Sequence, residues 1–563
     1  MNTRYEVQPL APADWLSQFP ELHPALASIL YRANIRTVEA VDHFLHPTYE
    51  RDQHDPFLFA DMQKVVDRII QAKEQNQSVL VYGDYDADGV CSTVLLYTAL
   101  QQIGVQTLGM YLPHRDTEGY GLNMAAVEKF AEQGIQLIIT VDCAISNAAE
   151  VTRAKELGMD VIVTDHHVEP PQLPEDAYAI INPQVKRCHY PWPMLAGVGV
   201  AFKVAQALGR TLKLGDGFEK WLMDLVAIST ITDCMPLLDE NRTFVKYGLV
   251  VLNKTKRLGL QQLIAATHKP DQAVTPGSIA FKIGPWINAA GRIDHANVAV
   301  HLLLANTMEQ AVADTATLEQ TNTNRQNQTE TMFKAARQQA KEQMDQPVLF
   351  TYGEDWPLGL VGLVAGKLVS EFHKPAFVMT TNQGHVFGSG RSVEGVDLIR
   401  TLQQMDQCFL RYGGHAMACG FTLQDTLSRP DFAATFIKTV QSQLDHLPTE
   451  HIEPVAAELT LTDLNWDFFE QLQLLEPFGE KHPEPQFQLT AVPVKDFQTV
   501  GATQKHLRLV LGDRSHSLKA IAFGFGAKAE SLHLGDVVTL IGTLGVNEWN
   551  GHRDLQFMVD DWL

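Results

Sequence analysis

Short apolar runs alternate with helical stretches between residues 78 and 181, and this alternation constrains the fold more than any other feature of the chain. Apolar runs at 79–82, 137–141 and 161–164 are each followed by a stretch with helical spacing of about 10 to 15 residues. Strands that alternate with helices in this way form a parallel sheet covered on both faces. The sequence therefore predicts a doubly wound α/β domain with its sites beyond the carboxyl ends of the strands.

The rest of the chain divides by pattern. Thr307–Gln346 lacks glycine and proline, which favours one or two long helices that separate two α/β segments. After Pro454 short alternating strands predict a small β-barrel of the OB type. We expect five parts: a helical lead-in, the first α/β domain, a connecting helix, a second α/β domain and a barrel, at 1–75, 76–300, 301–346, 347–448 and 449–563.

Composition restricts the environment and the class of protein. With 45% hydrophobic and 20% charged residues, the chain is typical of globular proteins. No run approaches the roughly 18 apolar residues of a membrane span, and the first 30 residues lack a signal-peptide pattern. Six cysteines without a C-x-x-C pair argue against structural zinc and favour a cytoplasmic location. A net charge of −22 argues against non-specific nucleic-acid binding by the whole surface, but not against a locally basic channel.

Three alternating aspartates follow the first strand, in the loop Gly83-Asp-Tyr-Asp-Ala-Asp-Gly89. A calcium EF-hand loop needs a glutamate at its twelfth position, which is Leu95 here, so that interpretation fails. A phosphoaspartate phosphatase, which also begins with D-x-D after a strand, remains open on this loop alone. The plain structural interpretation is a turn of self-capping aspartates. Because three carboxylates so close together repel one another, that turn would be costly without a cation.

Two further strands and one helix also end in potential metal ligands. Asp142 follows one strand, Asp165-His166-His167 follows another, and Asp233 ends an apolar helix. Parallel strands bring their carboxyl ends to one edge of the sheet, so we expect these groups to converge. Oxygen ligands with one imidazole suit two Mn²⁺ or Mg²⁺ ions better than zinc. Asp142, alone at its strand end, is the candidate to bridge the two metals.

Six segments in order resemble the DHH phosphoesterase superfamily, in the form of its RecJ-type exonuclease family. The segments lie between about residue 80 and 420 and include the DHH triplet at 165–167 and two glycine-rich motifs of a DHHA1 domain. They are 83–89, 112–122, 165–167 with 232–237, 285–292, 388–392 and 413–420. The resemblance implies 5′-to-3′ hydrolysis of single-stranded DNA to mononucleotides with Mn²⁺ or Mg²⁺, in DNA recombination and repair.

The resemblance also implies roles for individual residues. His167 would contact the scissile phosphate or its water, and Asp165 would orient the histidines. The other implied sets are the metal ligands Asp86, Asp88, Asp142, His166 and Asp233 with Asp84 as ligand or neighbour; a 5′-phosphate pocket of Arg115, Ser389 and Arg391; and nucleotide contacts at Asn288, Arg292 and His415. Single-strand-binding protein and a RecQ-type helicase are the implied partners beside single-stranded DNA.

Two alternatives remain from the same residues. A pyrophosphatase or short-oligonucleotide phosphodiesterase would use the same metals, but the additional barrel favours DNA. An inactive scaffold that only holds single strands would have lost metal ligands, and here every expected acid and His166 are present. The phosphoaspartate phosphatase becomes weaker as well, since it does not account for Asp165-His166-His167.

Overall fold

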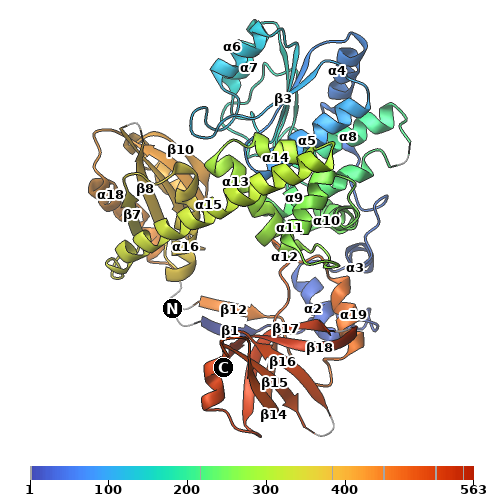
Figure 1. The fold of residues 1–563 in the computed structure, drawn as a ribbon, viewed down its shortest axis with the longest axis vertical. Coiled ribbons are helices and arrows are strands. Elements are labelled where there is room, and N and C mark those ends of the chain that lie inside the picture. The colour runs from blue at the N-terminus through green and yellow to red at the C-terminus, as the bar shows by residue number, and fades with distance from the viewer. Residues whose placement is uncertain (1–2, 216, 383, 448–450, 514–515, 550) are drawn as a thin grey trace. The chain divides into compact units, whose positions relative to one another are not determined.

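The computed structural model describes the whole chain except residues 1–2, 216, 383, 448–450, 514–515 and 550 (Figure 1). The described residues form two compact units. The larger unit comprises 54–235 and 244–448, and the smaller comprises 1–53, 236–243 and 449–563. Among the described residues, no helix combines the length and the apolarity that crossing a bilayer requires.

The first domain of the larger unit is built on a five-stranded parallel sheet, as predicted. Its strand order is β3 (Leu108–Tyr111), β2 (Val79–Tyr82), β4 (Leu137–Val141), β5 (Asp160–Thr164) and β6 (Ala179–Ile181). The three central strands, β2, β4 and β5, are almost entirely buried, which explains their continuous apolar sequences. Because β3 lies on one side of β2 and β4 on the other, the strand order reverses between β2 and β4, where such sheets bind ligands.

Helices cover both faces of this sheet (Figure 1). The helices α6 (Met124–Glu132) and α7 (Ala148–Glu156) pack together, and α5 (Ala87–Gln102) packs against α8 (Gly197–Thr211) and α9 (Met223–Thr232). The remaining helical segments of the domain are η1 (Pro56–Leu58), α4 (Met62–Glu74), η2 (Lys220–Leu222), α11 (Leu258–Thr267), α12 (Pro276–Ser278), η3 (Ile279–Ile283), α13 (Gly284–Ile293) and α14 (Asn297–Leu303). Helix α10 (Asp239–Leu252) belongs to the smaller unit up to Thr243 and to this domain from Phe244 onward.

One helix of 34 residues, α15 (Met308–Lys341), connects the two α/β domains of the larger unit, as its composition predicted. It packs against α13 and α14 of the first domain and against α16 (Leu358–Phe372) of the second. The second domain has a mixed sheet in the order β10 (Phe409–His415), β11 (Ala418–Leu423), β9 (His385–Arg391), β8 (Ala376–Asn382) and β7 (Leu349–Gly353). Its other helices are α17 (Leu398–Gln403), η4 (Asp406–Cys408) and α18 (Arg429–Leu444).

The smaller unit contains the predicted barrel. The sheet runs in the order β13 (Ala457–Leu459), β14 (Phe487–Val500), β15 (His506–Gly512), β16 (Ser517–Ala522), β18 (His552–Trp562) and β17 (Val537–Trp549). Pairing of β14 with β17 closes it. The short helix η5 (Gly526–Glu530) follows β16. The edge of β17 is thereby paired, which satisfies its backbone groups.

The N-terminal segment 1–75, predicted as a helical lead-in, contains short helices but is divided between the two units. It begins with a strand, β1 (Thr3–Val7), which pairs in parallel with β12 (His451–Val455). Residues 1–53 belong to the smaller unit, where α1 (Ala13–Leu16), α2 (Pro24–Arg32) and α3 (Val38–Leu45) share one hydrophobic core with α19 (Trp466–Leu474) and the barrel. Residues from 54 onward belong to the larger unit. Helical spacing shows that a face is apolar but not which distant segment covers it.

Candidate metal centre

Acidic side chains gather at the point where the strand order reverses. Asp84 comes two residues after β2, and Asp142 directly follows β4. On the next strand along, β5 leads directly into Asp165 and His166. The three loops extend from the carboxyl ends of neighbouring strands, so their side chains meet at one edge of the sheet. We call Asp84, Asp86, Asp88, Asp142 and Asp233 the acidic cluster.

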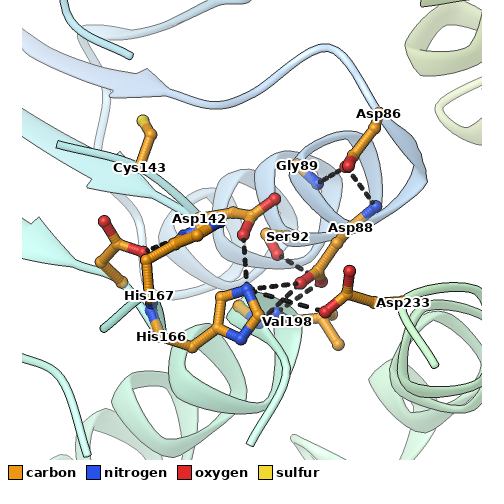
Figure 2. A network of polar contacts seen from close by, with 12 residues as sticks. Asp86, Asp88, Gly89, Ser92, Asp142, Cys143, His166, His167, Val198 and Asp233 are labelled. Atoms are coloured by element: carbon orange, nitrogen blue, oxygen red, sulfur yellow. Dashed lines mark hydrogen bonds and ion pairs between the residues drawn. The ribbon is translucent and has the colours of Figure 1, made fainter. Parts of the chain in front are cut away.

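The aspartate loop turns directly into helix α5. The carboxylate of Asp86 is the N-cap and accepts hydrogen bonds from the backbone N–H of Asp88 at 2.9 Å and of Gly89 at 3.1 Å (Figure 2). The plain structural interpretation, a self-capping turn, is thus correct for Asp86. Gly89 is required for the tight approach, because a Cβ there would lie 2.4 Å from the carbonyl oxygen of Asp84.

Four donors fix the carboxylate of Asp88. The first two backbone N–H groups of α8, those of Gly197 and Val198, donate to it at 2.6 and 2.9 Å. The hydroxyl of Ser92 donates at 3.4 Å, and the hydroxyl of Ser229 donates as well. The N-terminus of α8 therefore orients a buried carboxylate toward His166. A carboxylate has about four acceptor positions, so these bonds still leave capacity toward the cluster.

His166 presents an unprotonated nitrogen to the acidic cluster. Its Nδ1 lies 3.0 Å from the carbonyl oxygen of Leu195, and a carbonyl can only accept, so Nδ1 carries the proton. Burial lowers the pKa of His166, which favours the neutral ring. The lone pair of Nε2 then faces Asp142 Oδ1 at 3.1 Å, Asp233 Oδ2 at 3.6 Å and Asp88 Oδ2 at 3.7 Å (Figure 2). This tautomer and orientation are those of a metal-binding histidine.

Asp142 occupies a strained and crowded position. Its φ of +62° lies in the left-handed region, which is uncommon for non-glycine residues. A Cβ on Gly197 would lie 2.6 Å from the Cβ of Asp142, so only glycine fits beside it. Asp233 reaches the same place from the C-terminal end of α9.

The acidic cluster is electrostatically unsatisfied without a cation. Buried oxygens of Asp84, Asp142 and Asp233 find no hydrogen-bond donor among the described residues. Burial and then the charges of neighbouring aspartates raise the pKa of all three carboxyls well above their usual range. Three sets of ligand atoms lie within 4.8 Å of one another: Asp84 with Asp86 and Asp142; Asp88 with His166 and Asp233; and Asp142 with His166 and His167. This donor set, oxygen-rich with one imidazole, fits Mn²⁺ or Mg²⁺.

His167 is held beside the cluster by Asp165. The carboxylate of Asp165 is fully buried and lies 2.8 Å from Nδ1 of His167, while the hydroxyl of Tyr120 lies 3.0 Å from the same nitrogen. Burial alone would lower the pKa of His167, but the hydrogen bond and charge of Asp165 outweigh it and raise that pKa to about 9. Asp165 also accepts the N–H of Ile145 at 2.9 Å, which fixes the carboxylate.

Residues of the second α/β domain complete the site. A cavity of about 430 Å³ is lined by members of the acidic cluster and by Arg115, Ser389, Arg391 and His415. The guanidinium of Arg115 lies 4.4 Å above the ring of Tyr85, and its buried Nε has no hydrogen-bond partner within the described part of the chain. Arg391 donates to the hydroxyl of Ser389 at 3.0 Å. Cations and acids thus line the same cavity.

Of the three residues predicted to contact the nucleotide, only His415 lines the cavity that holds the acidic cluster. The Oδ1 of Asn288 accepts the N–H of Ala87 at 2.9 Å and so supports the aspartate loop. Arg292 donates to the carbonyl of Gly359 at 3.1 Å and lines a neighbouring cavity that also includes Arg115.

Sequence reasoning missed the groups that orient the acids and histidines. Among them are Tyr120, the carbonyl of Leu195, the N–H of Gly197 and the hydroxyl of Ser229. The only signal in the sequence is the Gly-Val-Gly that opens helix α8, and it does not indicate a partner for Asp88.

Three segments match known domain families. Residues 78–230 match the DHH family N-terminal domain, residues 345–444 match the DHHA1 domain, and residues 455–561 match the RecJ OB domain. Together they cover both α/β domains and the barrel. The predicted fold class is thereby confirmed.

Complete relatives and solved structures agree with these matches. The chain is 36% identical to the single-stranded-DNA-specific exonuclease RecJ of Bacillus subtilis (strain 168), over 99% of this chain and 70% of that protein. It is 32% identical to the protein of that name from Haemophilus influenzae, over 96% of both chains.

The structure of RecJ in complex with Mn²⁺ from Thermus thermophilus superposes with a TM-score of 0.83 at 28% identity, over 100% of this chain and 79% of that one. A structure of exonuclease RecJ bound to manganese gives 0.59 at 30% identity, over 70% of this chain and 97% of that one. The order of motifs, the domain matches and the full-length identity lead to one conclusion: this chain belongs to the RecJ family of single-stranded-DNA-specific exonucleases.

Proposed function

We propose that the protein is a 5′-to-3′ exonuclease that hydrolyses single-stranded DNA to mononucleotides with the help of two divalent cations. One observation carries the proposal: Nε2 of His166 faces carboxylate oxygens of Asp88, Asp142 and Asp233 at 3.1 to 3.7 Å, an arrangement that a divalent cation between them would satisfy. Relatives solved with Mn²⁺ and with Mg²⁺ support these two metals.

The acidic cluster and His166 are the proposed ligands of Mn²⁺ or Mg²⁺. Asp142 is the proposed bridge, because it belongs to two of the three sets of convergent ligand atoms. Asp84 is included as a ligand, since its buried Oδ1 has no other partner among the described residues. When bound, such a metal pair lowers the pKa of a shared water and offsets charge on the attacking and leaving oxygens.

His167 is proposed to contact the scissile phosphate. Nδ1 of the ring is held by Asp165 at 2.8 Å, so Nε2 is the nitrogen left to donate to a phosphate oxygen. Asp165 keeps the ring in that orientation. Tyr120 also contacts the backbone oxygen of Asp142 at 3.2 Å and thereby couples the two strand ends.

Arg115, Ser389 and Arg391 form the proposed clamp for the 5′-phosphate. Arginine offers a fork of donors to phosphate, and the unpartnered Nε of Arg115 is such a donor. A clamp beside the acidic cluster restricts hydrolysis to the first nucleotides of the strand and so sets the direction. Arg292 and His415 are proposed to contact the nucleotide, and Asn288 contributes through the aspartate loop.

The direction can be tested with single strands labelled at either end. We expect that removing the 5′-phosphate, or changing Arg391→Ala, weakens binding at the 5′ end more than binding elsewhere on the strand. Initial rates and gel analysis of the labelled products measure this. Equal degradation from both ends would contradict the clamp.

Single-stranded DNA is also the proposed ligand of the barrel, in keeping with the match to the RecJ OB domain. On its strands the side chain of Arg508 bonds Gln498 and that of Lys519 pairs with Asp554, so these two cations already have partners. Single-strand-binding protein, a RecQ-type helicase and a cytoplasmic location stay predictions from the family resemblance.

One assay tests which class of nucleic acid is the substrate. End-labelled single-stranded DNA, double-stranded DNA and RNA are incubated with the full chain in Mn²⁺, in Mg²⁺ or in chelator. We expect rapid loss of single-stranded DNA with either metal and none in chelator. Activity that survives chelation, or a preference for duplex, would overturn the proposed function.

A further inference from the structure

A second cavity lies beyond the proposed 5′-phosphate clamp, and only its clamp residues and Arg292 have a role in the function proposed so far. Its volume is about 670 Å³, and it shares Arg115, Ser389, Arg391 and Gly420 with the cavity that holds the acidic cluster. None of the five aspartates of that cluster lines it. The clamp residues thus separate a carboxylate-lined cavity from this second space.

Arginines dominate the walls of this second space, which we call the arginine cavity. Arg115, Arg292, Arg391 and Arg411 line it, and Asp116 is the sole acid among its lining residues in the described part of the chain. In a chain of net charge −22 such a concentration of cations is unusual. Burial and then the neighbouring charge of Arg115 lower the pKa of Arg292 to about 10. The arginine cavity therefore suits an anion with several charges.

The strand register explains how Arg411 comes to lie there. Ser389 pairs with Gly420, which pairs with Gly413, and in the next row Phe387 pairs with Thr422, which pairs with Arg411. Residues two apart on a strand share a face, so Ser389, Arg391 and Arg411 project from the same side of the sheet. Arg411 lies two strands from β9, about 10 Å away at the usual strand spacing.

Two glycines keep the floor between the clamp and Arg411 open. A Cβ on Gly413 or on Gly420 would meet no described atom within 4 Å. On the opposite wall, a Cβ on Gly362 would lie 2.8 Å from a guanidinium nitrogen of Arg391. Leu358 and Gly359, the first residues of the 15-residue helix α16, also line the cavity, and the N-cap residue of this helix makes no side-chain capping bond. The N–H groups of Leu358 and Gly359 at this helix N-terminus add donors for an anion.

We propose that the arginine cavity receives the additional phosphates of a strand whose 5′ end is a di- or triphosphate. This inference rests on the proposed function, because the α-phosphate would occupy the clamp of Arg115, Ser389 and Arg391. The β- and γ-phosphates then extend over Gly420 and Gly413 toward Arg411. Thr422, which accepts the Nε–H of Arg411 at 3.3 Å, holds that guanidinium in place.

The reaction on such a strand keeps the ordinary chemistry. Water attacks the phosphorus that joins the first two nucleotides, and the bond from that phosphorus to the 3′-oxygen of the first nucleotide breaks. The hydroxyl stays on phosphorus as the new 5′-phosphate of the shortened strand, and a proton ends on the 3′-oxygen. The first product is therefore an intact nucleoside 5′-triphosphate, and later products are monophosphates.

The test compares three single strands of one sequence, with 5′-hydroxyl, 5′-monophosphate and 5′-triphosphate ends, using the full chain and Mn²⁺. We expect kcat/KM for the triphosphate to lie within about threefold of that for the monophosphate, with both above the hydroxyl. Anion-exchange chromatography should show nucleoside triphosphate as the first product. A triphosphate strand degraded no faster than the hydroxyl strand, or one first trimmed to pyrophosphate and monophosphate, overturns the inference.

Two variants test whether the additional phosphates bind in the arginine cavity. Arg411→Gln should lower kcat/KM for the triphosphate strand about tenfold, the size of one charge-assisted hydrogen bond, and leave the monophosphate strand unchanged. Gly413→Leu, which places a side chain in the open floor, should give the same selective loss. Arg400→Gln, an exposed arginine of the same domain outside the cavity, is the control.

Equal losses on both phosphorylated strands would place Arg411 in general binding and overturn the inference. Thermal unfolding of each variant shows that it is folded. If the monophosphate strand is degraded and the triphosphate strand is not, the inference fails and the proposed function stands. If neither strand is degraded, both fail.

Discussion

Both units of the protein contain buried charge, but they differ in how far hydrogen bonds satisfy it. The charge of Arg242 in the smaller unit is fully hydrogen-bonded, whereas the acidic cluster of the larger unit is not. Arg242 is only 2% exposed, yet its guanidinium donates five hydrogen bonds, to the carbonyls of Phe44, Leu474, Leu475, Glu476 and Pro477. Four of these carbonyls follow one another at the end of helix α19, where the helix leaves acceptors unpaired. The acidic cluster instead leaves oxygens of three buried carboxylates without donors among the described residues.

This difference separates a structural charge from a functional one. A buried ion whose hydrogen bonds are complete holds segments together and needs nothing further. A buried group without partners costs folding free energy unless something binds it. We therefore interpret the carboxylates that lack hydrogen-bond donors as a binding site, and the fully hydrogen-bonded Arg242 as a residue that stabilises the smaller unit. Four substitutions test that distinction.

The largest effect is expected at the acidic cluster. Asp142→Ala should lower nuclease activity by more than about a thousandfold, because the ligands act as one unit. Its unfolding temperature without metal should be unchanged or higher, since one repelling charge is gone. Saturating Mn²⁺ should raise the unfolding temperature of the parent protein but not of this variant.

Calorimetry and a nuclease assay measure both effects, with Asp67→Ala, an exposed acid of the same domain, as the control. A variant that still degrades DNA at the parent rate would show that Asp142 does not bridge the metals.

The second largest effect is expected at Arg242, where stability should fall while stabilisation by Mn²⁺ is retained. Arg242→Met should destabilise the smaller unit by about 3 to 5 kcal/mol, because five buried carbonyls lose their donor. The stabilisation of the larger unit by Mn²⁺ should persist. Denaturant unfolding measures the loss, and Arg553→Met, an exposed arginine near Trp466, is the matched control. An unchanged midpoint of denaturant unfolding would mean that the five hydrogen bonds do not stabilise the smaller unit.

His482 should make the smaller unit sensitive to acid. It is 3% exposed, its Nε2 lies 2.7 Å from the carbonyl of Leu475, and burial together with nearby Arg242 lowers its pKa from 6.5 to about 4. A lowered histidine pKa means that the unfolded chain binds the proton first. The contribution of neutral His482 to the free energy of unfolding is therefore fully present above pH 6.5. It is lost as the pH falls toward 4, by about 3 kcal/mol at most.

His482→Gln, which keeps a donor for the Leu475 carbonyl, should remove this part of the pH dependence. Unfolding of the parent and the variant between pH 4 and 7 measures the difference, with the exposed His533→Gln as the control. Parallel pH curves would assign the acid sensitivity to other groups.

The smallest effect is expected at Tyr120, a neighbour of the acidic cluster whose hydroxyl already has partners. Tyr120→Phe removes a hydroxyl 3.0 Å from Nδ1 of His167 and 3.2 Å from the oxygen of Asp142. We expect kcat to fall about tenfold, as for other groups that orient a metal site, with little change in stability or metal binding. A loss as large as that of Asp142→Ala would place Tyr120 in direct contact with the reacting groups.

Some conclusions needed only the order of residues. Apolar strands followed by acids predicted the parallel sheet, the edge where its ligands lie and the convergence of Asp84, Asp142 and His166, because strand direction alone brings those ends together. The stretch Thr307–Gln346 predicted α15 because it contains no glycine or proline to interrupt a helix. These features depend on local periodicity and chain direction.

Other features were decided only by the tertiary structure. The proton on Nδ1 of His166 is set by the carbonyl of Leu195, the orientation of Asp88 by the first turn of α8, and the place of residues 1–53 by a core shared with the barrel. The arginine cavity likewise depends on the register between β9, β10 and β11. Each joins groups far apart in sequence through one specific contact, and no periodicity within a segment records which distant partner it will meet.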